Sequence, residues 1–522
     1  MFGWTSQSTR PPALSIADLR RYYKIRVTGL ERPHQPRNLS TEVATLGRDW
    51  GKPLYYTDPG EFALFTDLYE LTMAASYFEN RMFAPATFSL YIREYPPNRA
   101  YFVAAGIQEV IKYLYHIRFT EDDLRYLASL GLFNADFLDF LREFRFTGEV
   151  RAIPEGRIFF VNEPIMEVTA PIIQAQLFET FILNAVGFET LLATKASRCF
   201  YAARGRVCVD FSFRRTQGFD AGMKVARACY IAGFAATSNM LAGKAFGIPV
   251  VGTMAHSYIE SFPSELDAFR AFANLFPDNT TLLVDTYDTI SGARKAVVVA
   301  KELEARGHRL RAVRLDSGDV GELAKEVRRI LDEAGLGYVR IFASGAMDEY
   351  RIDELLRAGA PIDGFGVGTK LGVSADAPWA DIVYKLVKYD GKPVLKLSPG
   401  KQTLADEKQV YRLRDKGGKF IKDIISLRDE NPPEASAEPL LVPMMAGGEP
   451  LVDPTPLEKI RETFFADFAA LDDRHKAIYN PEHYPVELSP KLAARQAEVI
   501  EQVRRKEVAA GRPEPGDGGR AV

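Results

Sequence analysis

The sequence predicts an α/β protein: an irregular, TIM-like barrel of about seven parallel strands, with a second α+β domain built from the segments before and after the barrel. Two observations predict this fold. Between residues 207 and 370, short apolar segments alternate with helical patterns, a rhythm typical of a parallel sheet. Each apolar segment also ends in polar residues or glycine, as on the catalytic face of a barrel, whereas an open sheet would place such residues mainly near its switch point.

Length and composition limit the class of protein. The 522 residues are enough for two or three domains. Lysine and arginine number 66 against 69 acidic residues, so a net charge of −3 gives no basic field for nucleic acid or an anionic membrane. No segment has the roughly 18 uninterrupted apolar residues of a membrane span, and the N-terminus lacks a secretory signal. We therefore expect a cytoplasmic protein without nucleic-acid or membrane partners.

The three cysteines, Cys199, Cys208 and Cys229, lack the spacing of a zinc site or of a disulfide framework. Small, unpaired cysteines are most often core residues in a reducing compartment. We therefore predict that all three are buried in the core.

Two regions precede the barrel: an N-terminal extension, residues 1–50, and an α+β region, residues 51–187. The extension mixes proline, arginine and polar residues without sustained periodicity. A helix is predicted from residue 68, because Asp67 can cap it and Glu70 follows three positions later, which places Tyr69 on the first turn. A strand, two capped helices and an antiparallel meander are then predicted in TFSLYIREY, TEDDLRYLASLG, NADFLDFLREF and GEVRAIPEGRIFFVNEPIMEVTA.

The barrel itself is predicted over residues 188–375. Helical patterns such as AGMKVARACYIAGF and VGELAKEVRRILDEAG occupy the gaps between its strands. The seven predicted strands are VCVDFSF, FAATSN, PVVGTMAH, TLLVDTYD, LRAVRLDSGD, VRIFASGAM and IDGFGVGTKL.

Residues 376–470 are predicted to return to the first α+β region. DIVYKLVKYDGKPVLKLS contains two alternating runs joined by Asp390 and Gly391, a strong hairpin signal. Residues 471–522 are expected to form one helix, PKLAARQAEVIEQVRRKEV, followed by a flexible tail rich in glycine and proline.

Two glycine-rich segments follow the last two predicted strands, ASGAM at 343–347 and GFGVGTKLG at 364–372. Glycine lets backbone amides approach an anion without obstruction by side chains. Barrels often bind phosphate at the loops after their last two strands. The two segments therefore predict a phosphate site.

RLDSGD, at 314–319, follows a predicted strand and begins a helix. The amides of Ser317 and Gly318 would lie at the helix N-terminus, where anions bind, and Asp316 would face the barrel mouth, where a carboxylate can bind the accompanying cation. The alternative is a capped turn in which these residues only satisfy backbone amides.

Several cations lie near the first predicted strand. Arg214 and Arg215 follow it, either as a solvated pair on the rim or as a clamp for a carboxylate. Lys195 and Arg198, on the preceding helix, could bind a phosphate, although either alone is more typical of surface charge.

His256 lies just beyond the apolar run PVVGTMA, three residues after Thr253. A lone histidine is often structural, but at a strand end beside phosphate loops it is a candidate acid, base or phosphoryl-accepting nucleophile. His308 precedes a strand and is therefore predicted to be structural on the opposite face.

Eight segments, in order, resemble the nicotinate phosphoribosyltransferase family: TDLYELTMAASY, FETLLATKASR, DFSFRRTQG, GTMAHSY, VDTYDT, RLDSGD, ASGAMDEY and GFGVGTKLG. The resemblance implies an irregular barrel beside an α/β domain, in a homodimer with active sites between subunits. It also implies a reaction in which nicotinate and phosphoribosyl pyrophosphate give nicotinate mononucleotide and pyrophosphate. Mg²⁺ is expected as a cofactor, and ATP is expected as a co-substrate hydrolysed through a phosphohistidine.

The resemblance also implies residue roles. His256 would be the phosphorylated histidine and, with Asp316, catalytic. Nicotinate would be bound by Tyr69 (from the other subunit), Arg214 or Arg215, Thr253 and Arg314. Phosphoribosyl pyrophosphate would be bound by Arg198, Ser317, Gly318, Ser344, Gly345, Gly366, Gly368 and Thr369. Protein ligands for the metal stay open, since Mg²⁺ can be held through the substrate's pyrophosphate.

Two departures from the family pattern are the N-terminal extension and the lack of a C-terminal cysteine cluster. Three alternatives stay open: a nicotinamide phosphoribosyltransferase, a quinolinate phosphoribosyltransferase, and a non-catalytic barrel that binds a phosphometabolite. The arginines at 214 and 215 favour an acid over a neutral amide, and an ATP-linked histidine disfavours the quinolinate enzyme.

Overall fold

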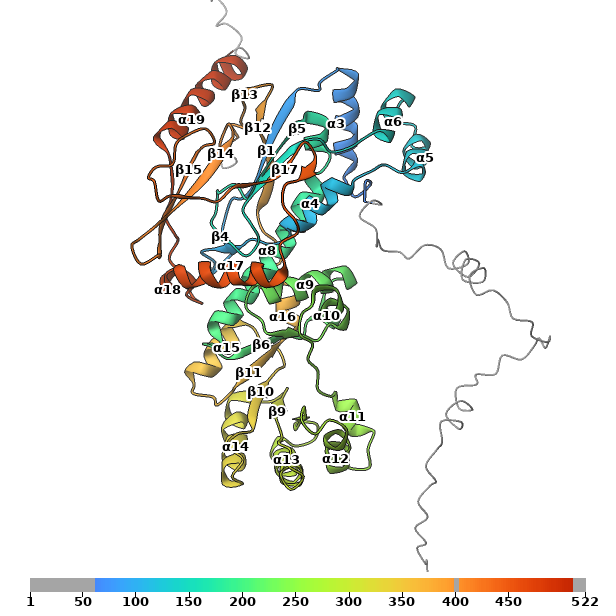
Figure 1. The fold of residues 1–522 in the computed structure, drawn as a ribbon, viewed down its shortest axis with the longest axis vertical. Coiled ribbons are helices and arrows are strands. Elements are labelled where there is room, and N and C mark those ends of the chain that lie inside the picture. Colours follow the sequence, from blue (N-terminus) through green and yellow to red (C-terminus); the bar gives the residue numbers. More distant parts are fainter. Residues whose placement is uncertain (1–61, 399–402, 510–522) are drawn as a thin grey trace, which may run out of the picture. The chain divides into compact units, whose positions relative to one another are not determined.

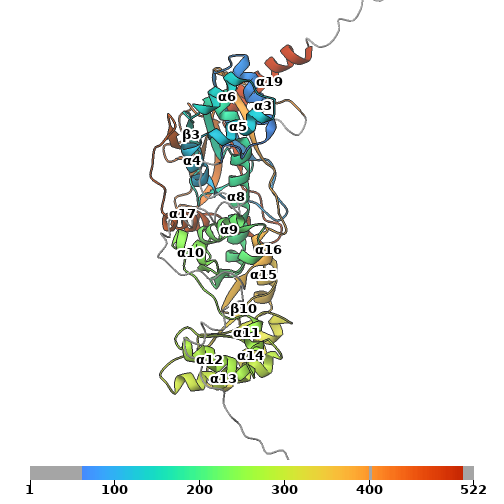
Figure 2. The same cartoon turned by 90° about the vertical axis from the view of Figure 1, so that its right-hand side faces the viewer.

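Figures 1 and 2 show the fold of the computed structural model, which describes residues 62–398 and 403–509. All of these residues belong to one compact unit. The extension predicted at residues 1–50 and the tail from residue 510 lie outside the described residues.

A seven-stranded sheet joins strands from distant parts of the sequence, in the order β13-β12-β1-β5-β3-β17-β18. β1 (Pro85–Ile92) lies antiparallel to both β5 (Met166–Pro171) and β12 (Ile382–Tyr389). β12 and β13 form the hairpin predicted at Asp390-Gly391, which confirms that the chain returns to this sheet after the parallel strands. The other strands are β3 (Glu149–Ala152), β13 (Lys392–Pro393), β17 (Val442–Ala446) and β18 (Glu449–Pro450).

Both faces of β1 are covered, since every residue of the strand after Pro85 is buried. Phe88 stacks on Tyr384 of β12, with ring centroids 4.8 Å apart, the diagonal contact that stabilises neighbouring strands. Helices pack around this sheet: α3 (Leu68–Glu79), α4 (Ile107–His116), α5 (Glu121–Ser129), α6 (Ala135–Arg142) and α7 (Ile172–Gln176). β2 (Phe102–Val103) and β4 (Ile158–Phe159) form a separate antiparallel sheet of two strands.

The second large sheet has six parallel strands in the order β7-β6-β11-β10-β9-β8. The pairing of β11 with β6 brings the last strand beside the first, as in a barrel. The strands are β6 (Val207–Asp210), β7 (Ala236–Thr237), β8 (Thr281–Leu283), β9 (Ala312–Leu315), β10 (Arg340–Ala343) and β11 (Gly364–Val367).

The predicted seventh strand, PVVGTMAH, is not a strand among the described residues. It contributes only a bridge between Val250 and Thr237 on the β7 side. Pro249 has no N–H for a ladder, and Val250 and Val251 are 44% and 40% exposed. The parallel sheet is therefore a six-stranded half-barrel, and the seven-stranded barrel is not confirmed.

Helices follow each parallel strand, and α13 and α14 lie side by side next to β9 in Figure 1. The helices in this part of the chain are α9 (Phe219–Ile231), α10 (Met240–Phe246), α11 (His256–Glu260), α12 (Glu265–Leu275), α13 (Thr289–Glu304), α14 (Val320–Glu333), α15 (Glu349–Arg357) and α16 (Thr369–Gly372).

α8 (Glu179–Ala202) is a long, mostly buried helix that contacts α4 and β12 as well as α9 and α15. The stretch Ile172–Ala202 is apolar and long enough to cross a membrane, but 78% of its most apolar window is buried inside the protein, as in a core helix. The domain limit predicted between residues 187 and 188 falls within α8, so the domain limits drawn from the sequence stay predictions.

The three cysteines are free and buried, as predicted.

A four-stranded sheet, β16-β14-β15-β19, was not predicted. It consists of β14 (Lys408–Arg414), β15 (Phe420–Leu427), β16 (Glu438–Pro439) and β19 (Val486–Leu488). Three helices accompany it: α17 (Leu457–Ala470), α18 (Asp473–Lys476) and the predicted C-terminal helix, α19 (Pro490–Val503).

Candidate functional site

Arg314 is the centre of a group of side chains at the carboxyl ends of β9 and β10. Its Nη2 donates to Asp316 Oδ1 at 2.7 Å, and its Nε donates to Ser344 Oγ at 2.8 Å. Its Nη1 donates to Thr253 Oγ1 at 3.1 Å and to Met254 O at 3.4 Å. Two strand ends and the loop that holds Thr253 therefore meet at one guanidinium, and we call these residues the strand-end group.

Asp316 is held as an anion. Its Oδ1 accepts a hydrogen bond from Ser344 as well as from Arg314, and its N–H donates to Asp285 Oδ2 at 2.9 Å. Burial raises the pKa of Asp316, but the hydrogen bond from Ser344 and the charges of Arg314 and His256 outweigh burial and lower this pKa below its ordinary value. The carboxylate is thus available to bind cations or hydroxyl groups at neutral pH.

Gly345 allows the ASGAM loop to approach RLDSGD. Its φ of +82° is in the left-handed region, and a Cβ on this residue would lie 2.0 Å from Asp316 O. Gly318 also has a positive φ, +76°, and Ser317 Oγ donates to Asp285 Oδ2 at 2.5 Å. The ASGAM loop and the RLDSGD loop therefore pack directly against each other.

His256 begins α11 and is partly buried. Its Nδ1 lies 3.1 Å from Thr286 Oγ1, beyond the end of β8. This contact fixes the ring and leaves Nε2 without a hydrogen-bond partner among the described residues. Nε2 is therefore the nitrogen free for chemistry.

The glycines of β11 leave room for Phe211. A Cβ on Gly366 would lie 2.5 Å from the Phe211 ring, and one on Gly368 would lie 3.1 Å from Phe211 O. The Arg314 guanidinium lies over the same ring, 5.4 Å from its centroid. These glycines thus have a packing role, while phosphate binding by the amides of Gly366, Gly368 and Thr369 stays a prediction.

Arg214 and Arg215 lie in the short 3-10 helix η2 (Phe213–Arg215), directly after β6. Both side chains are exposed, and neither pairs with an acidic residue in the described part of the chain. Their guanidinium groups are therefore free to bind an added anion.

Tyr69 lies on α3, beside the seven-stranded sheet, and is 46% exposed. Its hydroxyl donates to Glu70 Oε1 at 3.4 Å, and burial, followed by the charge of Glu179, raises its pKa above the ordinary value. None of its described hydrogen bonds reaches the strand-end group.

Arg198 does not join the strand-end group. Its side chain is fully buried, and it donates to Glu349 Oε1 at 3.1 Å and to two carbonyl oxygens of the segment 477–478. Lys195, one turn earlier, pairs with Glu349 at 2.5 Å and with Asp376 at 2.6 Å. These contacts indicate structural roles, and this geometry gives no support to direct binding of phosphoribosyl pyrophosphate by Arg198.

Sequence reasoning did not assign roles to Asp285, Thr286 or Phe211. The first two directly follow the apolar run of TLLVDTYD, and their position after a strand was the available signal. The role of Phe211 depends on packing against β11, for which the sequence holds no local signal.

Asp285 is a candidate ligand for a metal ion. Its Oδ1 is buried without a hydrogen-bond partner in the described structure, while Oδ2 accepts from Asp316 N–H and Ser317. Carboxylate oxygens suit Mg²⁺. Among the described residues there is no group of three or more His, Cys, Asp or Glu side chains suited to a metal. The donor set therefore fits an ion held by one or two carboxylates together with substrate oxygens.

Three family models match the chain: the nicotinate phosphoribosyltransferase N-terminal domain at residues 64–187, the nicotinate phosphoribosyltransferase family at 207–417, and its C-terminal domain at 434–496. The chain belongs to the nicotinate phosphoribosyltransferase family. The resemblance found in the eight sequence segments is thereby confirmed.

Curated relatives carry the name of this family. A nicotinate phosphoribosyltransferase of Mycobacterium tuberculosis is 48% identical over 437 residues, which cover 83% of this chain and 93% of the relative. One of Bacillus subtilis is 38% identical over 471 residues, which cover 85% of this chain and 96% of the relative. Nearly the whole length of each relative is therefore matched.

Solved structures agree. The human nicotinic acid phosphoribosyltransferase superposes with a TM-score of 0.75 at 29% identity, covering 83% of this chain and 99% of that one. A nicotinate-nucleotide pyrophosphorylase from Pyrococcus furiosus gives a TM-score of 0.67 at 26% identity, covering 80% and 99%. The mixed α/β fold is thus that of known nicotinate phosphoribosyltransferase structures.

Proposed function

We propose that this protein transfers the phosphoribosyl group of phosphoribosyl pyrophosphate to the ring nitrogen of nicotinate, giving nicotinate mononucleotide and pyrophosphate, in the formation of NAD from nicotinate. Family membership and the names of the relatives support the reaction. The structural observation that carries it is the strand-end group, in which Arg314 holds the anionic Asp316 against the Gly345 loop.

Phosphoribosyl transfer breaks the bond between C1 of ribose and pyrophosphate while positive charge develops on the sugar. The protein must therefore fix the nicotinate nitrogen near C1 and stabilise the departing charge. In our proposal Asp316 and Ser344 bind the ribose hydroxyls. The amides of Ser317, Gly318 and Gly345, and of the loop Gly366–Thr369, bind the phosphate.

The arginines have two different tasks in this proposal. Arg314 already donates through four of its five N–H groups to protein acceptors, so its main task is to position Asp316 and Thr253. Arg214 and Arg215 are exposed and have no acidic partner in the described part of the chain, so one of them is the better clamp for the nicotinate carboxylate.

Mg²⁺ is proposed as the cofactor, held mainly by substrate pyrophosphate, and the carboxylates of Asp285 and Asp316 are the protein groups that would help to hold it. When bound, it would neutralise charge on the pyrophosphate leaving group. No further step in the proposal depends on it.

ATP is proposed as a co-substrate that phosphorylates His256. The free Nε2 would attack the γ-phosphorus of ATP, and the bond between this phosphorus and ADP would break. Water would later hydrolyse the phosphohistidine and release inorganic phosphate. Coupling of this cycle to phosphoribosyl transfer would account for a reactive histidine beside Asp316.

The proposed assembly is a homodimer in the cytoplasm. Tyr69 is exposed on a helix that shares no described hydrogen bond with the strand-end group, yet the family resemblance implies that its ring stacks on nicotinate. In a dimer, Tyr69 of one subunit would reach the nicotinate bound at the strand-end group of the other subunit.

Pyrophosphate release, assayed in parallel with nicotinate, nicotinamide and quinolinate, tests the function. We expect turnover with nicotinate and at least about tenfold lower efficiency with nicotinamide, because the amide presents an NH₂ to an arginine that needs an acceptor. Higher efficiency with nicotinamide or quinolinate would reassign the enzyme, and binding of phosphoribosyl pyrophosphate without turnover would favour the non-catalytic alternative.

A further inference from the structure

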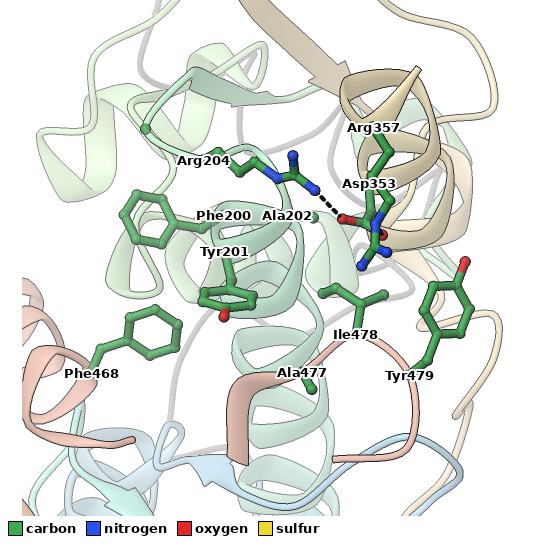
Figure 3. A pocket seen from close by; sticks show the side chains of 11 residues that line it. Phe200, Tyr201, Ala202, Arg204, Asp353, Arg357, Phe468, Ala477, Ile478 and Tyr479 are labelled. Carbon is green, nitrogen blue, oxygen red and sulfur yellow. Dashed lines mark hydrogen bonds and ion pairs between the residues drawn. The ribbon is translucent and has the colours of Figure 1, made fainter. Parts of the chain in front are cut away.

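A pocket of about 460 Å³ lies between the C-terminal ends of α8 and α15 and the segment after α18 (Figure 3). α8 and α15 end just before β6 and β11 begin, so the pocket is at the amino end of the parallel sheet, away from the strand-end group. Its volume is within the range of about 300–1,000 Å³ of small-molecule sites. We call it the α8–α15 pocket.

One side of the pocket is cationic. Arg204 Nη2 lies 2.8 Å from Asp353 Oδ1, and Arg357 Nε lies 2.7 Å from Asp353 Oδ2. The shared carboxylate is 6% exposed, whereas the two arginines are 46% and 67% exposed. Two guanidinium groups with one carboxylate leave an excess positive charge and several N–H groups free to bind an anion.

The other sides are aromatic. Tyr201 and Phe200, from the end of α8, make edge contacts with Phe468 at centroid distances of 6.2 and 6.0 Å. Figure 3 shows Tyr201 and Tyr479 on opposite sides of Ile478. Neither tyrosine hydroxyl has a hydrogen-bond partner among the described residues. The pocket is thus lined by aromatic rings and two phenol hydroxyls as well as by its cationic side.

We propose that the α8–α15 pocket binds a mononucleotide, with the base against Tyr201 and Tyr479 and the phosphate on Arg204 and Arg357. An aromatic base matches the ring faces, ribose hydroxyls match the free phenols, and a phosphate matches the forked guanidiniums. A free aromatic acid such as nicotinate shares the ring and the anionic charge but has no ribose to reach the phenols.

Calorimetric titration of the full chain with AMP tests the proposal, with adenosine, inorganic phosphate and nicotinate as partial ligands. We expect one AMP per chain, and weaker binding of adenosine and of phosphate alone. Arg357→Ala should weaken AMP binding by about tenfold or more, because a charge-assisted contact to phosphate is lost. Tyr479→Ala should weaken binding of both AMP and adenosine. Both variants should remain folded, because Tyr479 is 51% exposed and Arg204 still pairs with Asp353 in Arg357→Ala.

Arg351→Ala is the matched control, since Arg351 is on the same helix, pairs with Glu354 at 2.8 Å and does not line the pocket. It should bind AMP within about twofold of the unmodified protein, and Arg314→Ala should retain this binding too. Three results would overturn the proposal: no saturable binding of AMP, AMP binding unaffected by Arg357→Ala, or AMP binding lost in Arg314→Ala. Nicotinate that binds more tightly than AMP and is weakened by Arg357→Ala would overturn the nucleotide assignment.

Discussion

Arg314 and Asp316 pair at 2.7 Å although they are only two positions apart in the sequence. Successive residues of a strand point to opposite faces, so residues two apart share a face and can pair. Here the pair lies at the end of β9, where Ser344 and Thr253 also bind Arg314. The relationship makes Arg314 the residue on which the geometry of Asp316 depends.

Arg314→Ala should therefore affect both substrates. Removal of the guanidinium leaves the Asp316 carboxylate partly buried with only Ser344 as a side-chain donor, and such a loss costs about 1–3 kcal/mol. We expect kcat/KM for nicotinate and for phosphoribosyl pyrophosphate to fall by at least about tenfold. Arg311→Ala is the control, because Arg311 is exposed before β9 and binds Asn279. Equal kinetics in the two variants would contradict the assigned role.

Gly345→Ala tests the contact between the ASGAM loop and the RLDSGD loop. A left-handed φ costs a non-glycine residue roughly 1–2 kcal/mol, and the added Cβ would also meet Asp316 O, so the loop must shift. We expect a rise of about tenfold or more in KM for phosphoribosyl pyrophosphate. Gly335→Ala has a similar φ, +69°, but nothing within 4 Å of its Cβ, so it should lower stability while leaving KM unchanged. A KM effect of the same size in both variants would show that the contact with Asp316 is irrelevant.

Much of this site follows from local sequence signals. Polar residues after short apolar segments located Asp316, Ser344 and His256, and the glycines marked loops that pack closely together. Capping signals placed the start of α3, where Glu70 Oε2 accepts from the Asp67 N–H at 3.3 Å. In each case the signal and the structure involve residues within a few positions of one another.

What was missed depends on contacts between distant segments. Lys195 and Arg198 carry charge that is typical of a surface, but Glu349 and Asp376 allow them to be buried. The four-stranded sheet depends on β19 pairing with β15, some sixty residues earlier. PVVGTMAH has the apolar composition of a strand, yet pairing with β8 is a long-range property that composition does not determine.

Glu70 should make stability depend on pH. Burial raises the pKa of Glu70 from 4.5 to about 7, although the hydrogen bonds from Thr180 act in the opposite direction and lower it. The folded state therefore retains a proton that the unfolded chain loses above pH 4.5, so the free energy of unfolding should fall between about pH 4.5 and 7, by on the order of 3 kcal/mol. In Glu70→Gln this part of the pH dependence should be absent in urea unfolding measured from pH 4.5 to 8. The same slope in both proteins would show that Glu70 does not hold the proton.

His256→Ala should separate the two reactions. The variant should lose ATP hydrolysis and stimulation by ATP but retain slow phosphoribosyl transfer, because the sugar chemistry uses other groups. Thr286→Val, which removes the hydroxyl at 3.1 Å from Nδ1, should reduce ATP hydrolysis less than His256→Ala does. His308→Ala is the control, since His308 binds Asp278 near the amino end of β9. Stimulation by ATP that persists in a folded His256→Ala protein would exclude a phosphohistidine at this position.

Tyr69 provides the test of a shared site. If its ring completes the site of the partner chain, Tyr69→Ala and Arg314→Ala homodimers should each be weakly active, whereas a mixed dimer should contain one site with both residues intact. After subunit exchange of an equimolar mixture, half of the dimers are mixed, so activity should approach about a quarter of the unmodified value. Differently tagged chains allow the mixed dimer to be purified and assayed alone. Tyr126→Ala, a change at an exposed tyrosine on α5, serves as the control and should leave the homodimer active. A purified mixed dimer no more active than its parents would place Tyr69 and Arg314 in the site of the same chain, or Tyr69 outside the site altogether.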